Sequence, residues 1–389
     1  MNNETLVFDI KNLARRVRNS KNSIANSTIK SRNSILEDLA STIERNEKII
    51  LAANKLDIKG AKNISPALLD RLTLDSSRLM QMSIGVREVA KLPDPLGQWT
   101  DLSYRPSGIQ VGKMRVPLGV VAVIYESRPN VTADVGSLAL KSGNAVLLKG
   151  GSESLHTNAA ILDCIHEALR RNDLDEDCVH LVKSSDRAVV KELLQLDQFI
   201  DVLVPRGGKS LVEAVINNAK MPVIKHLDGV CHVYVDESAD LDMAVKISLN
   251  SKIDRVGVCN AMETLLVSES IASVFAPTII EEFLVHGVEL RGCDLVRKLN
   301  NRIMPASEED WSSEYLAPIL SMKIVPDIDA AITHINSYGS GHTDVIVSKD
   351  YQRIRKFLRE VDSSSVMANA STRFADGYEY GLGAEVGIS

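Results

Sequence analysis

Apolar residues recur at helical spacing through the first part of the chain. Leu36, Leu39 and Ile43 lie three to four residues apart, as one buried face of an α-helix requires. The same spacing returns around Val86, with no alternation typical of a strand between them. The pattern therefore predicts an all-helical segment over residues 6–93.

A segment with glycines then breaks the helical pattern. Between Tyr104 and Pro117, Gly108 and Gly112 separate short alternating runs that carry basic residues at their edges. Alternating runs punctuated by glycine are typical of a β-hairpin. Because an isolated hairpin has unpaired edges, we expect this one to need another strand to join.

From residue 119 onward, short apolar runs alternate with helix-length segments. Four strand–helix units occupy residues 119–225, and a second alternating series occupies residues 240–369. Such alternation is typical of doubly wound parallel sheets covered by helices. We therefore expect two α/β domains, with the boundary within residues 227–239, where the alternation pauses.

Composition and charge narrow the function classes. Hydrophobic residues make up 44% of the chain and charged residues 25%, which is near the globular average. The 45 Lys and Arg residues are scattered among 51 Asp and Glu residues, for a net charge of −6. Nothing in this balance favours a nucleic-acid partner.

The chain also lacks the patterns of membrane, secreted and metal-binding proteins. Its longest apolar run, residues 116–125, is broken by Pro117 and Gly119 and is too short to span a bilayer. No continuous apolar signal opens the chain, and the five cysteines form no CxxC pair. The eight histidines show no ligand spacing. We expect a cytoplasmic protein with reduced thiols and no metal or membrane partner.

Two glycine-rich loops are candidates for binding an anionic ligand. Lys149 and Gly150 open the first, and the second contains Arg206, Gly207 and Gly208. Each loop follows an apolar strand and precedes a helix, whose free N–H groups and dipole favour a phosphate. Neither matches a known phosphate-loop pattern, so a plain strand-to-helix turn remains the alternative for each. Two such loops with basic residues together favour a phosphate-bearing cofactor.

One cysteine lies where it can act as a nucleophile. Cys259 precedes Asn260 in a glycine-bearing loop, and a loop cysteine held as thiolate can attack a carbonyl. A buried, inert thiol is the alternative, and Cys164 fits that description because it lies in an apolar helical pattern. Cys231 and His232 do not form a dyad, because neighbours on a strand point to opposite faces.

A cluster of polar residues closes the first predicted strand after Tyr125. Ser127, Arg128 and Asn130 could hold an oxyanion or a phosphate, and a solvated loop is the alternative. The residues alone thus indicate an α/β enzyme that uses a phosphate-bearing cofactor, with a cysteine nucleophile as an open possibility.

Four stretches of the sequence resemble the gamma-glutamyl phosphate reductase family. They are long and specific, and the likeness extends over nearly the whole chain. That family belongs to the aldehyde dehydrogenase superfamily, so the resemblance implies an aldehyde dehydrogenase-like α/β fold. Such a fold has two doubly wound domains and a small β-hairpin used in oligomerisation. The matching stretches are residues 117–130, 222–232, 257–264 and 371–377.

The resemblance also implies how the chain divides into functional parts. It implies an NADP-binding domain, a catalytic domain, and a hairpin that serves oligomerisation together with a C-terminal segment. These parts correspond to residues 1–101 with 118–226, residues 227–370, and residues 102–117 with 371–389.

The activity implied by the resemblance is the NADPH-dependent reduction of L-glutamate 5-phosphate to L-glutamate 5-semialdehyde, a step of proline synthesis. Cys259 matches the catalytic cysteine of the family, which displaces phosphate to form a thioester that hydride then reduces. The thioester divides one difficult step into two easier ones. Besides the substrate and phosphate, the pathway suggests glutamate 5-kinase as a protein partner.

The resemblance further assigns roles to the loop residues. Lys149, continuing into Gly150, aligns with the lysine near the adenosine ribose, and Arg206 is a second cation for the 2′-phosphate. Gly207 and Gly208 align beside the pyrophosphate. Glu314 aligns with the glutamate that holds the nicotinamide ribose. The predicted substrate and oxyanion residues are Ser127, Arg128, Asn130, Asn260 and Arg373.

The sequence departs from the family pattern in three places. The family continues past Ser389 into a strand used for oligomerisation, so we expect a weak homodimer or a monomer. The lead-in at residues 252–257 lacks the expected proline, which leaves the conformation of the cysteine loop open. Where hydrolytic aldehyde dehydrogenases carry a water-activating glutamate, this chain has His226, which either acts as a base or only bonds a backbone carbonyl.

Two alternatives to the implied activity remain. One is a non-catalytic scaffold that keeps the fold, against which the combination of Cys259, Lys149 and Glu314 argues. The other is a different acyl-phosphate or aldehyde dehydrogenase, which only a test of substrates distinguishes.

Overall fold

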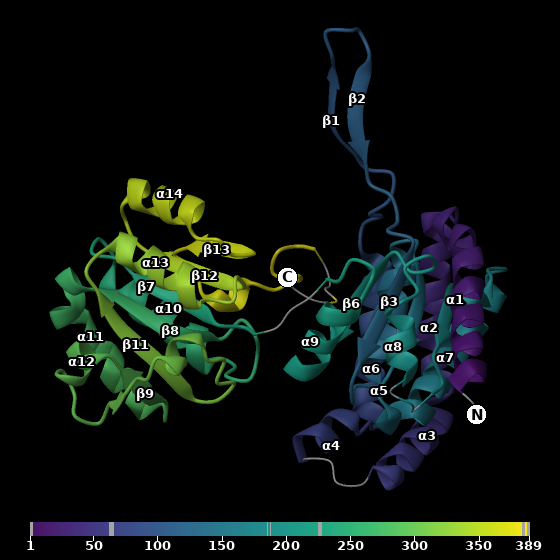
Figure 1. Cartoon of the computed structure of the whole chain (residues 1–389), viewed down its shortest axis with the longest axis horizontal. Coiled ribbons are helices and arrows are strands. Elements are labelled where there is room, and N and C mark those ends of the chain that lie inside the picture. The colour runs from purple at the N-terminus through teal and green to yellow at the C-terminus, as the bar shows by residue number, and fades with distance from the viewer. Residues whose placement is uncertain are drawn as a thin grey trace. The chain divides into compact units, whose positions relative to one another are not determined.

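The chain consists of two compact units, which are described separately here. They comprise Met1–Lys225 and His226–Ser389 (Figure 1). The computed structural model describes residues 3–61, 66–184, 186, 188–224, 228–382 and 386.

Helices form the start of the first unit, as the hydrophobic spacing predicts. Their buried faces carry the periodic residues, such as Leu36, Leu39 and Ile43, all fully buried on the second helix. Side chains cap the helix starts, since Thr28 accepts a hydrogen bond from the Ser31 N–H at 3.1 Å. Before the first strand, the described residues form α1 (Asn3–Ala25), α2 (Ile29–Arg45), α3 (Glu47–Gly60), α4 (Pro66–Leu72) and α5 (Ser76–Lys91).

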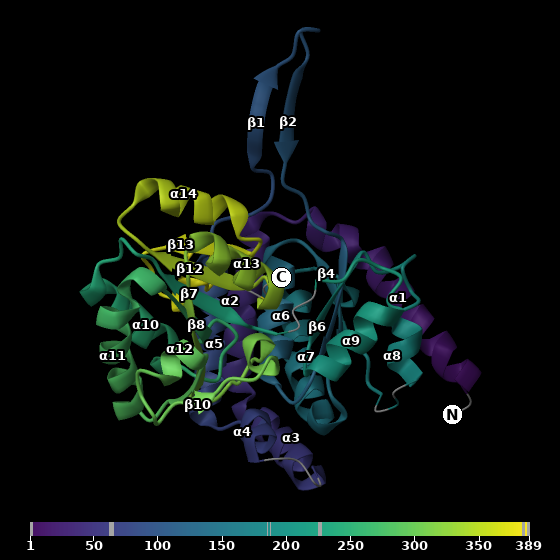
Figure 2. The same cartoon turned by 60° about the vertical axis from the view of Figure 1, so that its left-hand side comes forward.

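The predicted hairpin is present, but its first strand begins at Trp99, before residues 102–104, where the sequence predicts its start. Strand β1 (Trp99–Tyr104) pairs antiparallel with β2 (Gln110–Met114), and the turn between them contains Gly108 at φ +83°. Gly112 lies inside β2 instead of breaking it. Nearly all side chains of both strands are exposed, and the hairpin stands away from the helices and sheet of its own unit (Figures 1 and 2).

A parallel four-stranded sheet forms the core of the first unit. Its strands are β3 (Val120–Tyr125), β4 (Ala145–Lys149), β5 (Val179–Leu181) and β6 (Val202–Arg206), in the order β5-β4-β3-β6. Nearly all strand residues are buried, as expected for parallel strands covered by helices. The alternating helices are α6 (Asn130–Lys141), α7 (Leu155–Arg171), α8 (Ala188–Leu193) and α9 (Lys209–Asn218).

The chain order of this sheet reverses direction between two neighbouring strands. From β3 the chain continues to β4 and β5 on one side, and then returns to β6 on the other side of β3. Ligands of open α/β sheets bind at such a point, outside the carboxyl ends of the strands. A further predicted strand at 223–225 is reduced to an isolated bridge between Val223 and Leu203 in the described part of the chain.

The second unit contains a larger parallel sheet. Its order is β10-β9-β11-β8-β7-β12-β13, and its core packs Phe275 and Phe283 against strand residues such as Leu265. Its described strands are β7 (Cys231–Val235), β8 (Met262–Ser268), β9 (Glu289–Gly292), β10 (Met304–Pro305), β11 (Ile319–Val325), β12 (Thr343–Val347) and β13 (Ser365–Ala368). Its described helices are α10 (Leu241–Ile253), α11 (Glu269–Val285), α12 (Asp294–Arg297), α13 (Ile328–Tyr338) and α14 (Tyr351–Glu360).

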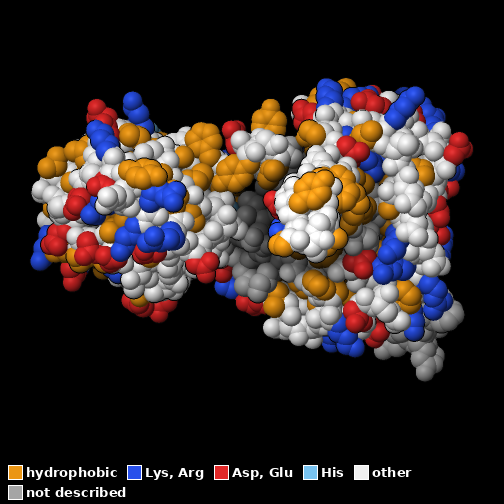
Figure 3. Space-filling view, turned by 90° about the horizontal axis from the view of Figure 1, so that it is seen from above, with side chains coloured by type: hydrophobic (Ala, Val, Ile, Leu, Met, Phe, Trp, Pro, Cys, Tyr) orange, Lys and Arg blue, Asp and Glu red, His pale blue; other side chains and the backbone are white. Residues whose placement is uncertain are grey.

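The α/β class predicted from the alternation is confirmed in both units. The strand β10 escaped prediction because its two residues are too few to carry a pattern. None of the helices in the described ranges has the length and apolar character needed to cross a bilayer. Acidic and basic side chains are intermixed on the face shown in Figure 3.

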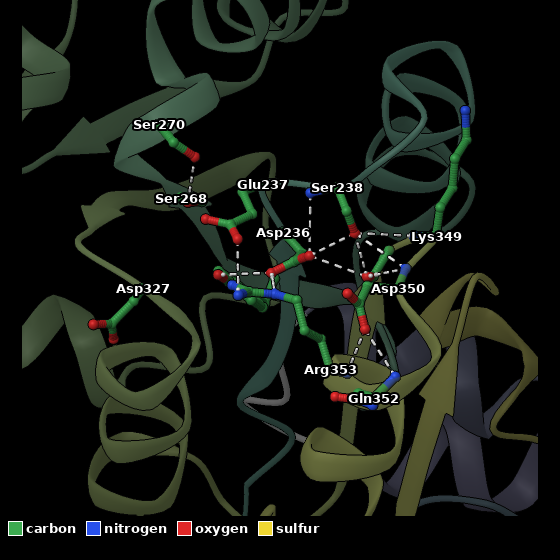
Figure 4. A network of polar contacts seen from close by, with 12 residues as sticks. Asp236, Glu237, Ser238, Ser268, Ser270, Asp327, Lys349, Asp350, Gln352 and Arg353 are labelled. Carbon is green, nitrogen blue, oxygen red and sulfur yellow. Dashed lines mark hydrogen bonds and ion pairs between the residues drawn. The ribbon is translucent and has the colours of Figure 1, made fainter.

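A polar network closes the carboxyl ends of β7 and β12 in the second unit (Figure 4). Asp236 is fully buried and accepts hydrogen bonds from Ser238 Oγ at 2.8 Å and Ser348 Oγ at 3.0 Å. Arg353 Nε donates to the same carboxylate at 2.7 Å. Burial opposes ionisation of this group, but these donors outweigh it and lower the pKa of Asp236. This edge of the sheet is therefore occupied by a network of mutually bonded side chains.

Candidate active site

Three predicted loops of the first unit meet at one edge of its sheet. The register pairs Ile124 of β3 with Lys149 of β4, and Tyr125 with Arg206 of β6. The loops that follow these strands therefore start side by side, around the point where the chain order reverses. The structure thus brings together the residues that the sequence identified separately, from Ser127 to Gly208.

The loop after β3 is held by one of the chain's own carboxylates. Ser127 has φ +39°, and both its N–H and its Oγ donate to Glu153 Oε1, at 2.6 and 2.7 Å. Burial raises the pKa of Glu153, but the Ser127 hydrogen bonds and the charge of Lys149 outweigh it, so the net shift is downward. The Ser127 donors predicted to hold an anion thus hold a carboxylate in this structure.

A second carboxylate lies at the start of α9. Glu126 Oε2 accepts a hydrogen bond from the N–H of Gly208 at 2.9 Å, at the N-cap of the helix. A Cβ on Gly207 would lie 2.6 Å from both Glu126 Oε2 and Leu211 Cδ2, so a larger residue here would displace the ends of these two side chains. The helix start therefore binds a carboxylate of the same chain, and its role toward a phosphate stays a prediction.

Lys149 ends β4 in a closely packed position. It is only 7% exposed, and its Nζ donates to the carbonyl of Gly150 at 2.6 Å. Burial lowers the pKa of Lys149, although the charge of Glu153 opposes the shift. A Cβ on Gly150 would lie 2.2 Å from Asn158 Nδ2, so the loop requires glycine here. This environment fits a lysine held in place for a ligand and not a freely solvated one.

Arg128 is not paired with a carboxylate of the described residues. Within the described part of the chain, its guanidinium forms no hydrogen bond or ion pair with another residue. Desolvation lowers the pKa of Arg128, and the positive charges of Arg71 and Arg206 lower it further. Arg71, on α4, is a residue that sequence reasoning missed, because a helix of the amino-terminal segment carries it. Asn130, also predicted here, donates to Asp134 Oδ2 at 2.8 Å.

The predicted nucleophile belongs to the second unit. It lies at the amino end of a strand, whereas the loops of the first unit lie at the carboxyl ends of their strands. Cys259 is partly exposed in the loop between α10 and β8, at the amino end of β8. We expected ligand-binding loops to follow strands, and this loop precedes one. In the same unit, the carboxyl ends of β7 and β12 are occupied by the Asp236 network.

Two contacts fix the backbone of the cysteine loop. A Cβ on Gly229 would lie 2.0 Å from the Cys259 carbonyl oxygen, so a glycine is required beneath the nucleophile. Cys231 Sγ donates to the same carbonyl at 3.2 Å, and burial raises the pKa of this second thiol. His232 instead bonds Asp344 Oδ1 through Nδ1 at 2.8 Å. Cys231 and His232 therefore form no dyad, as predicted.

Asn260 and Arg373 connect the cysteine loop to the segment after β13. Asn260 is buried and donates through Nδ2 to the Ala375 carbonyl at 3.0 Å. Arg373 Nη1 donates to Asn260 Oδ1, and its Nε donates to Asp254 Oδ2 at 3.0 Å. These contacts give both residues a part in holding the loop, and their role toward a substrate stays a prediction.

Sequence reasoning missed an ion pair that flanks the cysteine loop. Lys252, at the end of α10, and Glu263, at the start of β8, are both fully buried and paired with each other. Burial raises the pKa of Glu263 to about 7, against the opposing effect of Lys252, and burial lowers the pKa of Lys252. The signal available in the sequence is a glutamate within the mostly apolar run that forms β8. Glu314 is half-buried in the loop that precedes β11.

Two remaining predictions concern a histidine and a metal. His226 lies outside the described residues. Within the described ranges, no group of three or more His, Cys, Asp and Glu side chains is arranged to hold a metal ion.

Comparisons of the sequence and of the structure with known proteins indicate the same family. The model of the Aldehyde dehydrogenase family matches residues 7–288 and 304–382. The crystal structure of gamma-glutamyl phosphate reductase from Thermotoga maritima is 42% identical with a TM-score of 0.94, covering 98% of this chain and 92% of that chain. The protein of the same name from Saccharomyces cerevisiae is 32% identical with a TM-score of 0.53, covering 97% and 95%.

More distant structures share the fold. An acetylating aldehyde dehydrogenase from Geobacillus thermoglucosidasius is 18% identical with a TM-score of 0.64, and covers 99% of this chain and 90% of its own. The arrangement of two α/β units with a hairpin is therefore common to proteins that differ greatly in sequence.

Proposed function

Because the chain belongs to the aldehyde dehydrogenase family, and within it to the gamma-glutamyl phosphate reductases, we propose that it reduces L-glutamate 5-phosphate to L-glutamate 5-semialdehyde with NADPH. The family resemblance and the aldehyde dehydrogenase-like fold predicted from the sequence are confirmed. The observation that carries the proposal is the likeness to the Thermotoga maritima reductase over 98% of the chain, with Cys259 on a partly exposed loop.

The proposed reaction proceeds through two covalent states of Cys259. Its thiolate attacks the acyl carbon, a C–S bond forms, and the C–O bond to phosphate breaks. When bound, NADPH supplies the hydride that reduces the resulting thioester. The thiohemiacetal then collapses, which releases the aldehyde and returns the thiolate. Gly229 keeps the space beneath the nucleophile clear, and Cys231 fixes its carbonyl.

The residues of the first unit suit the cofactor. We propose that Lys149, with Arg206, holds the ribose and its 2′-phosphate, because a buried lysine retained by Gly150 is a fixed cation. Gly207 and Gly208 would receive the pyrophosphate at the start of α9. The absence of a side chain at Gly207 supports this fit, and Glu126 would leave the Gly208 N–H when the pyrophosphate binds. Glu314 would hold the nicotinamide ribose.

The leaving phosphate needs a cation that is not already paired. Arg373 is engaged by Asp254 and Asn260, whereas the Arg128 guanidinium has no partner in the described chain and lies near two other cations. We therefore propose Arg128 for the phosphate, whereas Ser127 and Asn130, the other donors predicted in this loop, would first have to leave Glu153 and Asp134.

We also propose a protein partner and a location in the cell. The substrate is an acyl phosphate, which reacts readily with water, so direct supply by glutamate 5-kinase would protect it. All five cysteines are free, which is compatible with a reducing cytoplasm.

A single substrate panel tests the function. The reaction is run in the oxidative direction with NADP, phosphate and one of several semialdehydes, and NADPH formation is followed by absorbance. We expect glutamate 5-semialdehyde to give a kcat/KM at least about tenfold above the other semialdehydes. Preference for another semialdehyde would indicate a different acyl-phosphate reductase, and absence of turnover with all of them would indicate a scaffold.

A further inference from the structure

Two buried charges bracket the loop that carries Cys259. Lys252 lies in the last turn of α10 before the loop, and Glu263 is the second residue of β8 after it. Both side chains are fully buried, and Lys252 Nζ donates to Glu263 Oε2. The ion pair therefore joins the two ends of the cysteine loop to each other.

The same pair contacts a second loop, which carries Glu314. The other oxygen of the carboxylate, Glu263 Oε1, accepts a hydrogen bond from the Leu316 N–H at 3.3 Å. Leu316 has φ +51°, a conformation that a non-glycine residue keeps only when its surroundings hold it. Lys252 Nζ also lies 5.9 Å from the centre of the Tyr315 ring. One buried carboxylate thus connects the base of the cysteine loop to the Glu314 loop.

Stability alone does not account for this pair. Removing two charges from water costs about as much as their attraction returns, and apolar residues of similar size would pack as well. A carboxylate, however, has two oxygens, so it can bond the ammonium on one side and a backbone N–H on the other. Apolar side chains would lose this connection between the two loops.

We propose that Lys252 and Glu263 are positioning residues, which fix the Glu314 loop relative to the Cys259 loop through the Leu316 N–H. This inference rests on the proposed function for the roles of Cys259 and Glu314. It predicts that the pair acts chiefly on cofactor binding, because the bond it makes to the second loop lies two residues from Glu314.

Two double variants separate this role from simple stability. Lys252→Met with Glu263→Met removes both charges and the acceptor for Leu316. Lys252→Met with Glu263→Gln also removes the charges but keeps an oxygen acceptor in the same place. Since neither leaves a single unpaired buried charge, both are expected to fold, which the melting temperature checks. Arg302→Met with Glu281→Met, which removes an exposed ion pair in the same unit and leaves no buried charge unpaired, is the matched control.

The kinetic readout is the KM for NADP compared with kcat. The Met/Met variant is expected to raise the KM for NADP about fivefold, with a smaller change in kcat, because one hydrogen bond that places Glu314 is lost. The Met/Gln variant is expected to restore this KM to within about twofold of wild type, and the control to leave it unchanged. An unchanged KM in the Met/Met variant, or an equally raised KM in both double variants, would overturn the proposal.

Hydrogen exchange measures the coupling of the loops without any activity. In the Met/Met variant, peptides covering residues 254–261 and 313–318 are expected to exchange faster together, while residues 236–238 keep their wild-type rate. Faster exchange in only one of the two loops would overturn the coupling. Failure of the proposed function is recognised separately, since it would leave wild-type protein inactive on glutamate semialdehyde without altering the exchange result.

Discussion

At the scale of single residues, the two cysteines Cys259 and Cys164 show how environment decides chemistry. Cys164 is buried in α7, and burial raises its pKa to about 11, so its thiol stays protonated at neutral pH. Cys259 is partly exposed on a loop whose backbone is fixed by Gly229 and Cys231. The same residue type is therefore a core side chain in one unit and a candidate nucleophile in the other.

Replacing each cysteine by alanine tests this contrast. Cys259→Ala is expected to lower kcat at least about 1,000-fold with little change in melting temperature, because the loop loses a nucleophile and no packed side chain. Cys164→Ala is the matched control, and is expected to retain activity while unfolding about 1–2 kcal/mol more easily. Residual activity of Cys259→Ala within about tenfold of wild type would remove the nucleophile assignment.

Lys149 is the residue on which we base the expected preference for NADPH over NADH. Its fixed ammonium is expected to pair with the 2′-phosphate that distinguishes NADPH from NADH. Lys149→Ala should therefore raise the KM for NADPH about tenfold and the KM for NADH less than about twofold, as measured by initial rates with each cofactor. Equal effects on both cofactors would contradict this role for Lys149.

At the scale of elements, the amino end of α9 binds a carboxylate of the same chain at the position predicted for the cofactor's pyrophosphate. The Gly208 N–H at the helix start donates to Glu126, a carboxylate from the loop after β3. We therefore expect Glu126 to compete with a pyrophosphate for this N–H.

Removing the charge of Glu126 tests this competition. Glu126→Gln is expected to lower the KM for NADP about threefold, because a neutral amide holds the helix start more weakly than a carboxylate does. Asp350→Asn at the N-cap of α14 is the matched control in the second unit, and should alter stability alone. Titration of NADP binding by fluorescence measures both variants, and weaker binding by Glu126→Gln would exclude the competition.

The elements also show what a sequence can and cannot reveal. Buried strands such as β3 and the helix starts after Lys149 and Gly208 follow from local patterns, so the sheet edge could be predicted. The contacts of Glu126 with Gly208, and of Glu263 with Leu316, join residues distant in the chain, and no local pattern encodes them. The position of Cys259 just before a strand also follows from the local pattern, but the contacts of its loop with Gly229 and Cys231 come from a distant part of the chain.

At the scale of the whole molecule, we expect phosphate, and not water as in hydrolytic aldehyde dehydrogenases, to attack the thioester. The stretch at residues 226–229 has no glutamate where those proteins activate water. We therefore expect steady NADPH formation from semialdehyde and NADP only when phosphate is present, and about one turnover per subunit without it. The measurement is a comparison of NADPH formation with and without phosphate, and rapid multiple turnovers without it, yielding free glutamate, would contradict the expectation.

The hairpin formed by β1 and β2 provides an exposed surface for self-association. Its exposed apolar side chains include Trp99, Leu102 and Tyr104, which are 59%, 53% and 76% exposed. Such a cluster on an unpaired edge favours contact with a second copy. The strands have only six and five residues, however, and a stable interface buries about 1,200–2,000 Å² in total. The hairpin alone therefore supports a weak dimer.

The expected state is a dimer that dissociates in the micromolar range. Leu102→Ser with Tyr104→Ser should shift the protein to monomer, raising the dissociation constant at least about tenfold, because the apolar contact area is lost. Tyr351→Ser is the matched control, since Tyr351 is 71% exposed on α14 and outside the hairpin. Sedimentation of all three proteins over a range of concentrations measures their dissociation constants. A stable tetramer at micromolar concentration, or a hairpin variant that associates as wild type does, would show that a larger surface holds the copies together.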